Sequence, residues 1–121
     1  LYNLLPLTTY LKSKGYKIHL ETSGAYPLTG EFDWVCLSPK KFIPPSEEIC
    51  KSADELKVII FNKSDIQWAE KYKEKVGRDC QLFLQPEWGK KEESESLILR
   101  YIEKNPEWRI SVQVHKYLGV R

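Results

Sequence analysis

The sequence predicts a single α/β domain built on parallel strands. Short apolar runs alternate with helical patterns, and successive runs are separated by a helix or by a loop of about a dozen residues, which requires parallel pairing through crossover connections. No linker or low-complexity segment divides residues 1–121. About five strands are expected, whereas a closed (β/α) barrel needs eight strands and about 200 residues or more. We therefore expect a partial barrel or an open sheet.

The expected elements alternate in type along the chain. They are a helix over 4–14, strands over 17–21 and 33–37, a short helix over 46–51, a strand over 56–61, a helix over 64–76, a strand over 81–85, a helix over 92–104 and a strand over 108–113. The longer helices repeat apolar residues at spacings of three and four, whereas the strands are short apolar runs. Apart from Lys57, the run at 56–61 is continuously apolar, which indicates a strand covered on both faces.

Local signals set the boundaries of these elements. Asn3 is the expected cap of the first helix, and Gly15 ends it. Pro44 and Pro45 exclude a regular element just before the short helix. Ser64 is the expected cap of the helix that follows the apolar strand. The later stops are Gly77, Pro86 and Pro106.

Composition and charge exclude several classes of protein. Nineteen basic and seventeen acidic residues leave a formal charge of +2, which is too balanced for a nucleic-acid-binding patch. No run approaches the roughly 18 apolar residues of a membrane span, and no signal peptide is recognisable. Cys36, Cys50 and Cys80 are widely spaced, which fits free thiols in a reducing cytoplasm rather than disulfides or a metal motif. The lack of methionine indicates that the sequence begins inside a longer reading frame or belongs to a processed product.

Polar clusters follow several of the expected strands at their carboxyl ends. Loops at that edge of a parallel sheet converge on one crevice, where ligands bind. The clusters are Glu21-Thr22-Ser23-Gly24, Ser38-Pro39-Lys40-Lys41, Gln85-Pro86-Glu87 and Gln113-Val114-His115-Lys116. Their mixture of charged, hydroxyl, amide and imidazole groups suits a polar small molecule. The alternative is that these clusters form only turns and strand ends. In the same way, Asp54-Glu55 next to Lys57 can be interpreted as a surface ion pair with no role in binding.

Five segments, in this order, resemble the 7-carboxy-7-deazaguanine synthase family of radical S-adenosylmethionine (SAM) enzymes. The segments are 21–24, 33–40, 55–57, 84–86 and 111–119. No single segment is specific, but together they extend over almost the whole chain. Val114 departs from the family's usual Gln-Thr-His-Lys, so a hydroxyl contact is lost at that position.

The resemblance implies a reaction and its cofactors. These enzymes convert 6-carboxy-5,6,7,8-tetrahydropterin to 7-carboxy-7-deazaguanine, a step toward queuosine, by using a [4Fe–4S] cluster to reduce SAM to a 5′-deoxyadenosyl radical. The family also implies Mg²⁺, a reducing electron donor and a homodimer. The fold would be the C-terminal part of a modified radical SAM barrel, with the cluster cysteines, a glycine-rich SAM segment and the Mg²⁺ ligands upstream of Leu1. The chain alone is then expected to be inactive.

The resemblance also implies binding residues. The SAM-binding residues would be Ser38, Lys40 and Gln85. The substrate-binding residues would be Glu21, Gln113 and His115. Glu21 is expected to accept hydrogen bonds from the amino-pyrimidine edge of the pterin, with SAM as its alternative partner, and His115 to lie near the substrate carboxylate. No catalytic or metal-binding residue is expected within the chain.

Three other functions remain open from the sequence. A different radical SAM enzyme, such as an activating enzyme, would share the partial barrel, although the 113–116 segment disfavours it. A non-catalytic α/β module would use the same rim to bind a nucleotide. A purely structural or interaction domain would leave the polar clusters as turns.

Overall fold

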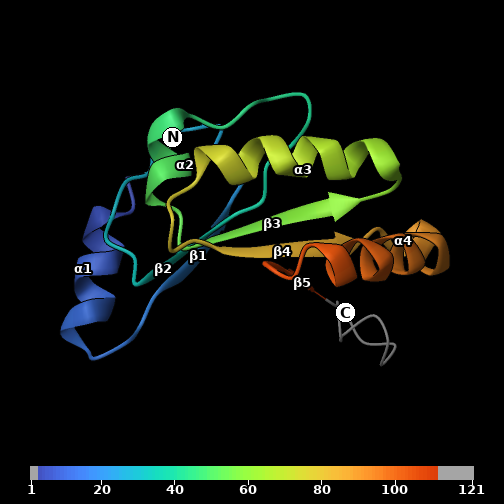
Figure 1. The fold of residues 1–121 in the computed structure, drawn as a ribbon. Coiled ribbons are helices and arrows are strands. Elements are labelled where there is room, and N and C mark those ends of the chain that lie inside the picture. The colour runs from blue at the N-terminus through green and yellow to red at the C-terminus, as the bar shows by residue number, and fades with distance from the viewer. Residues whose placement is uncertain (1–2, 112–121) are drawn as a thin grey trace.

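Within residues 3–111, which are those that the structure describes, five parallel strands form one sheet with the spatial order β1-β2-β3-β4-β5 (Figure 1). The strands of this computed structural model are β1 (His19–Thr22), β2 (Trp34–Leu37), β3 (Glu55–Ile60), β4 (Gln81–Pro86) and β5 (Trp108–Ile110). Each neighbouring pair of these strands is parallel. The predicted α/β class, with about five parallel strands, is therefore confirmed.

The helices begin and end within one residue of their predicted bounds. They are α1 (Leu5–Ser13), α2 (Glu47–Ser52), α3 (Lys63–Lys75) and α4 (Lys91–Lys104), with the 3-10 turn η1 (Trp88–Lys90) leading into α4. The prediction that Ser64 caps α3 is wrong. Asn62 is the cap, because its side-chain oxygen accepts the Ser64 backbone N–H at 3.0 Å. Leu4, not Asn3, occupies the cap position of α1, although the Asn3 amide oxygen accepts the Leu5 N–H at 3.0 Å.

The strand register gives the sheet two faces, because successive side chains of a strand point to opposite sides. We call the first the helix face: Leu20, Thr22, Val35, Leu37, Leu56, Val58, Ile60, Leu82, Leu84, Pro86, Trp108 and Ile110. We call the second the open face: His19, Glu21, Trp34, Cys36, Glu55, Lys57, Ile59, Gln81, Phe83, Gln85 and Arg109. The first set is apolar apart from one threonine, whereas most of the second is polar or charged.

The hydrophobic core lies between the helix face and helices α2, α3 and α4. Figure 1 shows α2 and α3 along the same side of the sheet. The strands contribute the fully buried Leu37, Leu56, Val58, Ile60 and Leu84, and the helices contribute Ile49, Ile66, Ala69, Tyr72 and Ile98. Each such aliphatic side chain stabilises the fold by roughly 1.5–3 kcal/mol through burial. No helix among the described residues is long and apolar enough to cross a membrane.

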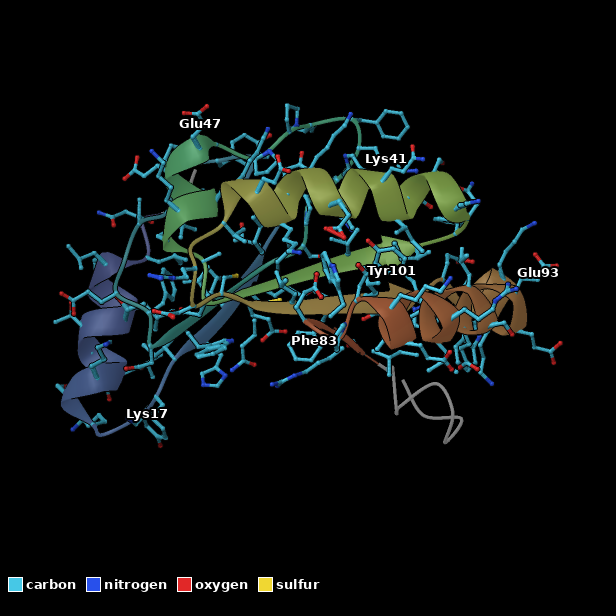
Figure 2. The ribbon with its side chains drawn as sticks, viewed as in Figure 1. Lys17, Lys41, Glu47, Phe83, Glu93 and Tyr101 are labelled. Carbon is cyan, nitrogen blue, oxygen red and sulfur yellow. The ribbon has the colours of Figure 1, made fainter. Side chains whose placement is uncertain are left out.

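The open face is only partly covered, which corrects the interpretation of β3 as a strand buried on both sides. The residues of β3 alternate in burial: Leu56, Val58 and Ile60 are fully buried, whereas Glu55, Lys57 and Ile59 are partly exposed. In Figure 2 the Phe83 side chain lies on the side of the sheet away from α3. The continuous apolar run of β3 therefore does not mark two packed faces, and the one charge within it, Lys57, lies on the open face.

The loop after β1 is fixed against the segment that precedes α2. Gly24 has a φ of +77°, and a Cβ at this position would lie 2.5 Å from the Cβ of Pro45, so only glycine fits. The Ser46 N–H donates to the Gly24 carbonyl at 3.0 Å, and the Gly24 N–H donates to the Thr22 hydroxyl at 3.1 Å. These contacts hold the carboxyl end of β1 in place beside β2.

Candidate functional site

The register brings three of the predicted site residues to the open face. Glu21 lies on β1 and Gln85 on β4. Ser38 follows β2 directly and continues its alternation, because its N–H donates to the Thr22 carbonyl at 2.8 Å. All three are at or near the carboxyl ends of parallel strands, where ligands of α/β sheets bind.

Ser38 and Gln85 are buried polar residues with unused hydrogen-bonding capacity. They are 5% and 3% exposed. The Gln85 side-chain oxygen accepts the Ser111 hydroxyl at a long 3.5 Å. Among the described residues, no hydrogen bond joins the Ser38 hydroxyl or the Gln85 amide nitrogen to another group, whereas the fully buried side-chain polar atom that lacks a partner is Ser94 Oγ. A hydroxyl and an amide at this edge of the sheet suit a polar ligand that both donates and accepts.

The β1 side of the open face carries charge. The Lys57 ammonium lies 2.8 Å from the Glu21 carboxylate, and the Lys57 side chain is 18% exposed against 57% for Glu21. The Glu55 carboxylate accepts the Trp34 indole N–H at 2.8 Å and the Cys36 thiol at 3.5 Å. These residues, with His19 and Leu20, line a hollow of about 340 Å³.

Asp54 and Glu55 do not form the surface ion pair suggested by their sequence. The Asp54 carboxylate accepts the Val35 backbone N–H at 2.8 Å, and its backbone continues the hydrogen bonding between β2, β3 and β4. The Glu55 carboxylate contacts Trp34 and Cys36. Both carboxylates therefore join neighbouring strands, and Lys57 is left to pair with Glu21.

Lys40 lies at the rim but away from the buried part of the open face. It is exposed, and it lines a second hollow of about 230 Å³ with Pro39, Lys41, Phe42, Ile59, Phe61 and Trp68. The neighbouring Lys41 is anchored, because its ammonium pairs with Asp65 and lies 5.7 Å from the centre of the Trp68 ring. Lys41 is therefore held against α3, whereas the neighbouring Lys40 is exposed at the rim.

Asp65 fixes this rim to the start of α3. Its side chain is 1% exposed and accepts the backbone N–H groups of Phe61 and Asn62 at 2.8 and 3.2 Å, as well as the Lys41 ammonium. Burial alone would raise the pKa of this carboxyl, but the hydrogen bonds from Lys41 and the two backbone N–H groups outweigh it and lower the pKa. Asp65 is therefore a buried, ionised anchor.

Cys36 and Cys80 have thiols whose pKa is raised by their surroundings. Burial, followed by the nearby Glu55 charge, raises the pKa of Cys36 to about 12, and burial raises that of Cys80 to about 11. Both thiols are therefore protonated at neutral pH when no metal is bound. No three His, Cys, Asp or Glu side chains between residues 3 and 111 are grouped to hold a metal ion.

Two of the predicted substrate residues, Gln113 and His115, lie outside the described residues. The structure adds Lys57 to the candidate site. A signal for it was present in the sequence, since a lysine inside the otherwise apolar run 56–61 must either reach solvent or find a carboxylate. Its partner could not be identified without the register of β1 against β3.

The fold and the open face define the class of protein: a parallel α/β domain that offers buried polar groups to a ligand at the carboxyl edge of its sheet. No protein-family model matches the chain. Over 119 residues it is 50% identical to the 7-carboxy-7-deazaguanine synthase of Flavobacterium psychrophilum, covering 98% of this chain and 57% of that protein. It is 49% identical over 121 residues to the enzyme of the same name from Synechocystis sp., covering 100% of this chain and 58% of that protein.

A solved structure agrees with these sequence relatives. The chain aligns with QueE from Escherichia coli with a TM-score of 0.79 and 25% identity, over 93% of this chain and 51% of that one. The chain thus spans little more than half the length of the proteins it matches. The resemblance drawn from the five segments is confirmed: along nearly its whole length, the chain is homologous to the 7-carboxy-7-deazaguanine synthases.

Proposed function

We propose that this chain is the C-terminal part of a 7-carboxy-7-deazaguanine synthase and forms part of the binding rim for SAM and substrate. The observation that carries the proposal is identity of 49–50%, over 98–100% of the chain, to two proteins of that name. The reaction would be the ring contraction of 6-carboxy-5,6,7,8-tetrahydropterin to 7-carboxy-7-deazaguanine. SAM and a [4Fe–4S] cluster, when bound, would supply the radical chemistry.

In this proposal Ser38, Lys40 and Gln85 bind SAM. The buried Ser38 hydroxyl can both donate and accept, and the Gln85 amide nitrogen can donate to an adenine or ribose acceptor. The exposed Lys40 ammonium can reach the ribose or methionine oxygens from the rim. Support comes from the unused capacity of the first two groups on the open face.

Glu21, Gln113 and His115 bind the substrate in the same proposal. The Glu21 carboxylate is 57% exposed, so it can accept hydrogen bonds from the amino-pyrimidine edge of a pterin. An imidazole at position 115 would donate to the substrate carboxylate. Gln113 would act beside it.

The remaining parts of the enzyme would come from elsewhere in the protein. We propose that the cluster cysteines and the Mg²⁺ ligands lie upstream of residue 1, where they complete a radical SAM barrel with this single domain. The complete enzyme would act in the cytoplasm as a homodimer supplied by a reducing electron donor.

Anaerobic assays of the complete protein test the proposal. With reconstituted cluster, SAM and a reductant, we expect conversion of 6-carboxytetrahydropterin to 7-carboxy-7-deazaguanine, detected by mass spectrometry. Ser38→Ala and His115→Ala should each lower kcat/KM roughly tenfold or more, as expected for one lost polar contact to a ligand. An activating enzyme would cleave SAM without making this product. A binding module would not assemble a cluster, and either result would refute the proposal.

A further inference from the structure

We propose that Lys57 is a positioning residue for the substrate site, which holds the Glu21 carboxylate in place so that it can accept N–H donors of the ligand. This inference rests on the proposed function, because it assigns Glu21 to the substrate. It concerns a residue on the central strand that does not itself lie among the polar clusters at the strand ends.

The first argument is the difference in burial between the two partners. The Lys57 side chain is 18% exposed, whereas that of Glu21 is 57% exposed, and their charged atoms lie 2.8 Å apart. The ammonium is therefore the inner partner and the carboxylate the outer one. An incoming ligand meets Glu21 first, and Lys57 supports it from the sheet.

The second argument is the path of the ion pair across the sheet. Glu21 is aligned with Cys36 on β2, and Cys36 is aligned with Glu55 on β3. Lys57 lies two residues further along β3 on the same face. The pair therefore crosses β2 diagonally, toward the strand end where Ser38 follows. This path connects the carboxylate of an edge strand to the middle of the sheet.

The third argument is that Glu55, the other charged residue of β3 on this face, already has partners of its own. Glu55 already accepts the Trp34 indole N–H and the Cys36 thiol. On the neighbouring β4, the residue aligned with Lys57 is Phe83, which has no charge. Glu21 is thus the acidic partner for Lys57 among the described residues.

These contacts predict which edge of the ligand binds here. The Lys57 ammonium lies 2.8 Å from Oε1 of Glu21, and the Glu21 side chain is 57% exposed, so the carboxylate can accept further donors from the hollow. A second carboxylate would be repelled by Glu21 at this position, whereas an amino group next to a ring N–H would complement it. The donor edge of a pterin-like heterocycle therefore binds at Glu21, and the acid group of the same molecule must lie farther away.

Kinetics of the complete enzyme test this assignment. Lys57→Met should raise the KM for the carboxypterin substrate roughly tenfold, as expected for a disturbed charged hydrogen bond. The SAM dissociation constant should change less than about twofold, and Lys57→Arg should restore most of the substrate affinity. Because Lys57 acts through Glu21, the double variant Lys57→Met/Glu21→Gln should have a KM for the substrate no higher than that of Glu21→Gln alone.

Lys73→Met is the matched control, because it removes an ion pair with Glu107 (2.5 Å) whose side chains are both 37% exposed, and it should leave both constants unchanged. Circular dichroism verifies folding, and Lys57→Gln replaces Lys57→Met if the latter unfolds. Equal losses of SAM and substrate affinity would refute the inference. The inference would also be refuted if the KM of the double variant rose by the product of the two single-variant increases. Product formation by the wild-type enzyme reports on the proposed function separately.

Discussion

The two faces of the sheet are made by the same five strands of the described region, but their chemistry is opposite. On the helix face, side chains such as Leu56, Val58 and Ile60 are fully buried against α2, α3 and α4. On the open face, the residues next to them in sequence carry charges and amides and remain partly exposed. One face therefore supplies the stability of the domain, and the other supplies polar groups that a ligand can use.

This difference separates folding from binding at the level of single residues. Alternation along a strand places a core residue and a site residue 1 position apart, as with Leu84 and Gln85. Changes on the helix face should act on the free energy of unfolding. Changes on the open face should act mainly on ligand affinity, and the following predictions test this division.

The largest effect is expected from neighbouring isoleucines on β3. Ile60→Ala should lower the free energy of unfolding by about 2–5 kcal/mol, because Ile60 is fully buried in the core. Ile59→Ala should cost only about 1–2 kcal/mol, because part of the Ile59 side chain is already in water. Urea denaturation followed by circular dichroism measures both. Equal losses would mean that another part of the protein covers the open face as tightly as the helices cover the other.

A smaller effect is expected from the buried carboxylate of the helix side. Asp65→Asn should destabilise the protein by about 1–3 kcal/mol at pH 7, because the Phe61 and Asn62 N–H groups and the Lys41 ammonium lose an ionised acceptor. The exposed Glu21 provides the comparison on the open face. Glu21→Gln should cost about 1 kcal/mol or less in stability.

The Asp65 effect should also depend on pH in a defined direction. The pKa of Asp65 in the folded protein is lowered, because its hydrogen bonds outweigh burial. Its contribution is therefore complete above the unfolded pKa of about 3.9 and is lost as the pH falls through the folded value. The gap between wild type and Asp65→Asn should narrow below about pH 4. A gap that stays constant from pH 7 to pH 3 would contradict the lowered pKa.

Much of the fold follows from local sequence patterns. Helical spacing and capping residues predicted each helix to within one residue, because an amphipathic helix is encoded within a few turns. The one capping error involved Asn62 and Ser64, two good caps that lie close together, so local preference could not separate them. The partial exposure of β3 on the open face could not be predicted, because a continuous apolar run does not show whether one or both faces of the strand are packed against other elements.

The site residues that lie at strand ends could be predicted from the sequence. The contact that depends on the alignment of neighbouring strands could not. Ser38 and Gln85 were selected because they end apolar runs, and the structure brings both to the open face. The pairing of Glu21 with Lys57 depends on aligning β1 with β3 through β2, which are long-range contacts. Sequence spacing contains no direct information about that alignment.

The smallest effect is expected at the polar contact between α3, α4 and β5. Glu70 accepts the Tyr101 hydroxyl and the Trp108 indole N–H, and Figure 2 shows Tyr101 between α3 and α4. Tyr101→Phe should cost about 0.5–1.5 kcal/mol, because Glu70 keeps the Trp108 contact and lies 3.7 Å from Lys73.

The pH dependence of this contact has the opposite sign to that of Asp65. Burial first, and then the Glu70 carboxylate, raise the pKa of Tyr101. Its contribution is therefore complete below the unfolded pKa of about 10 and is lost as the pH rises through the folded value. Wild type and Tyr101→Phe should converge in stability only in strong alkali, as measured by urea denaturation at stepped pH. A stability difference that stays constant as the pH rises well above 10 would contradict the raised pKa of Tyr101.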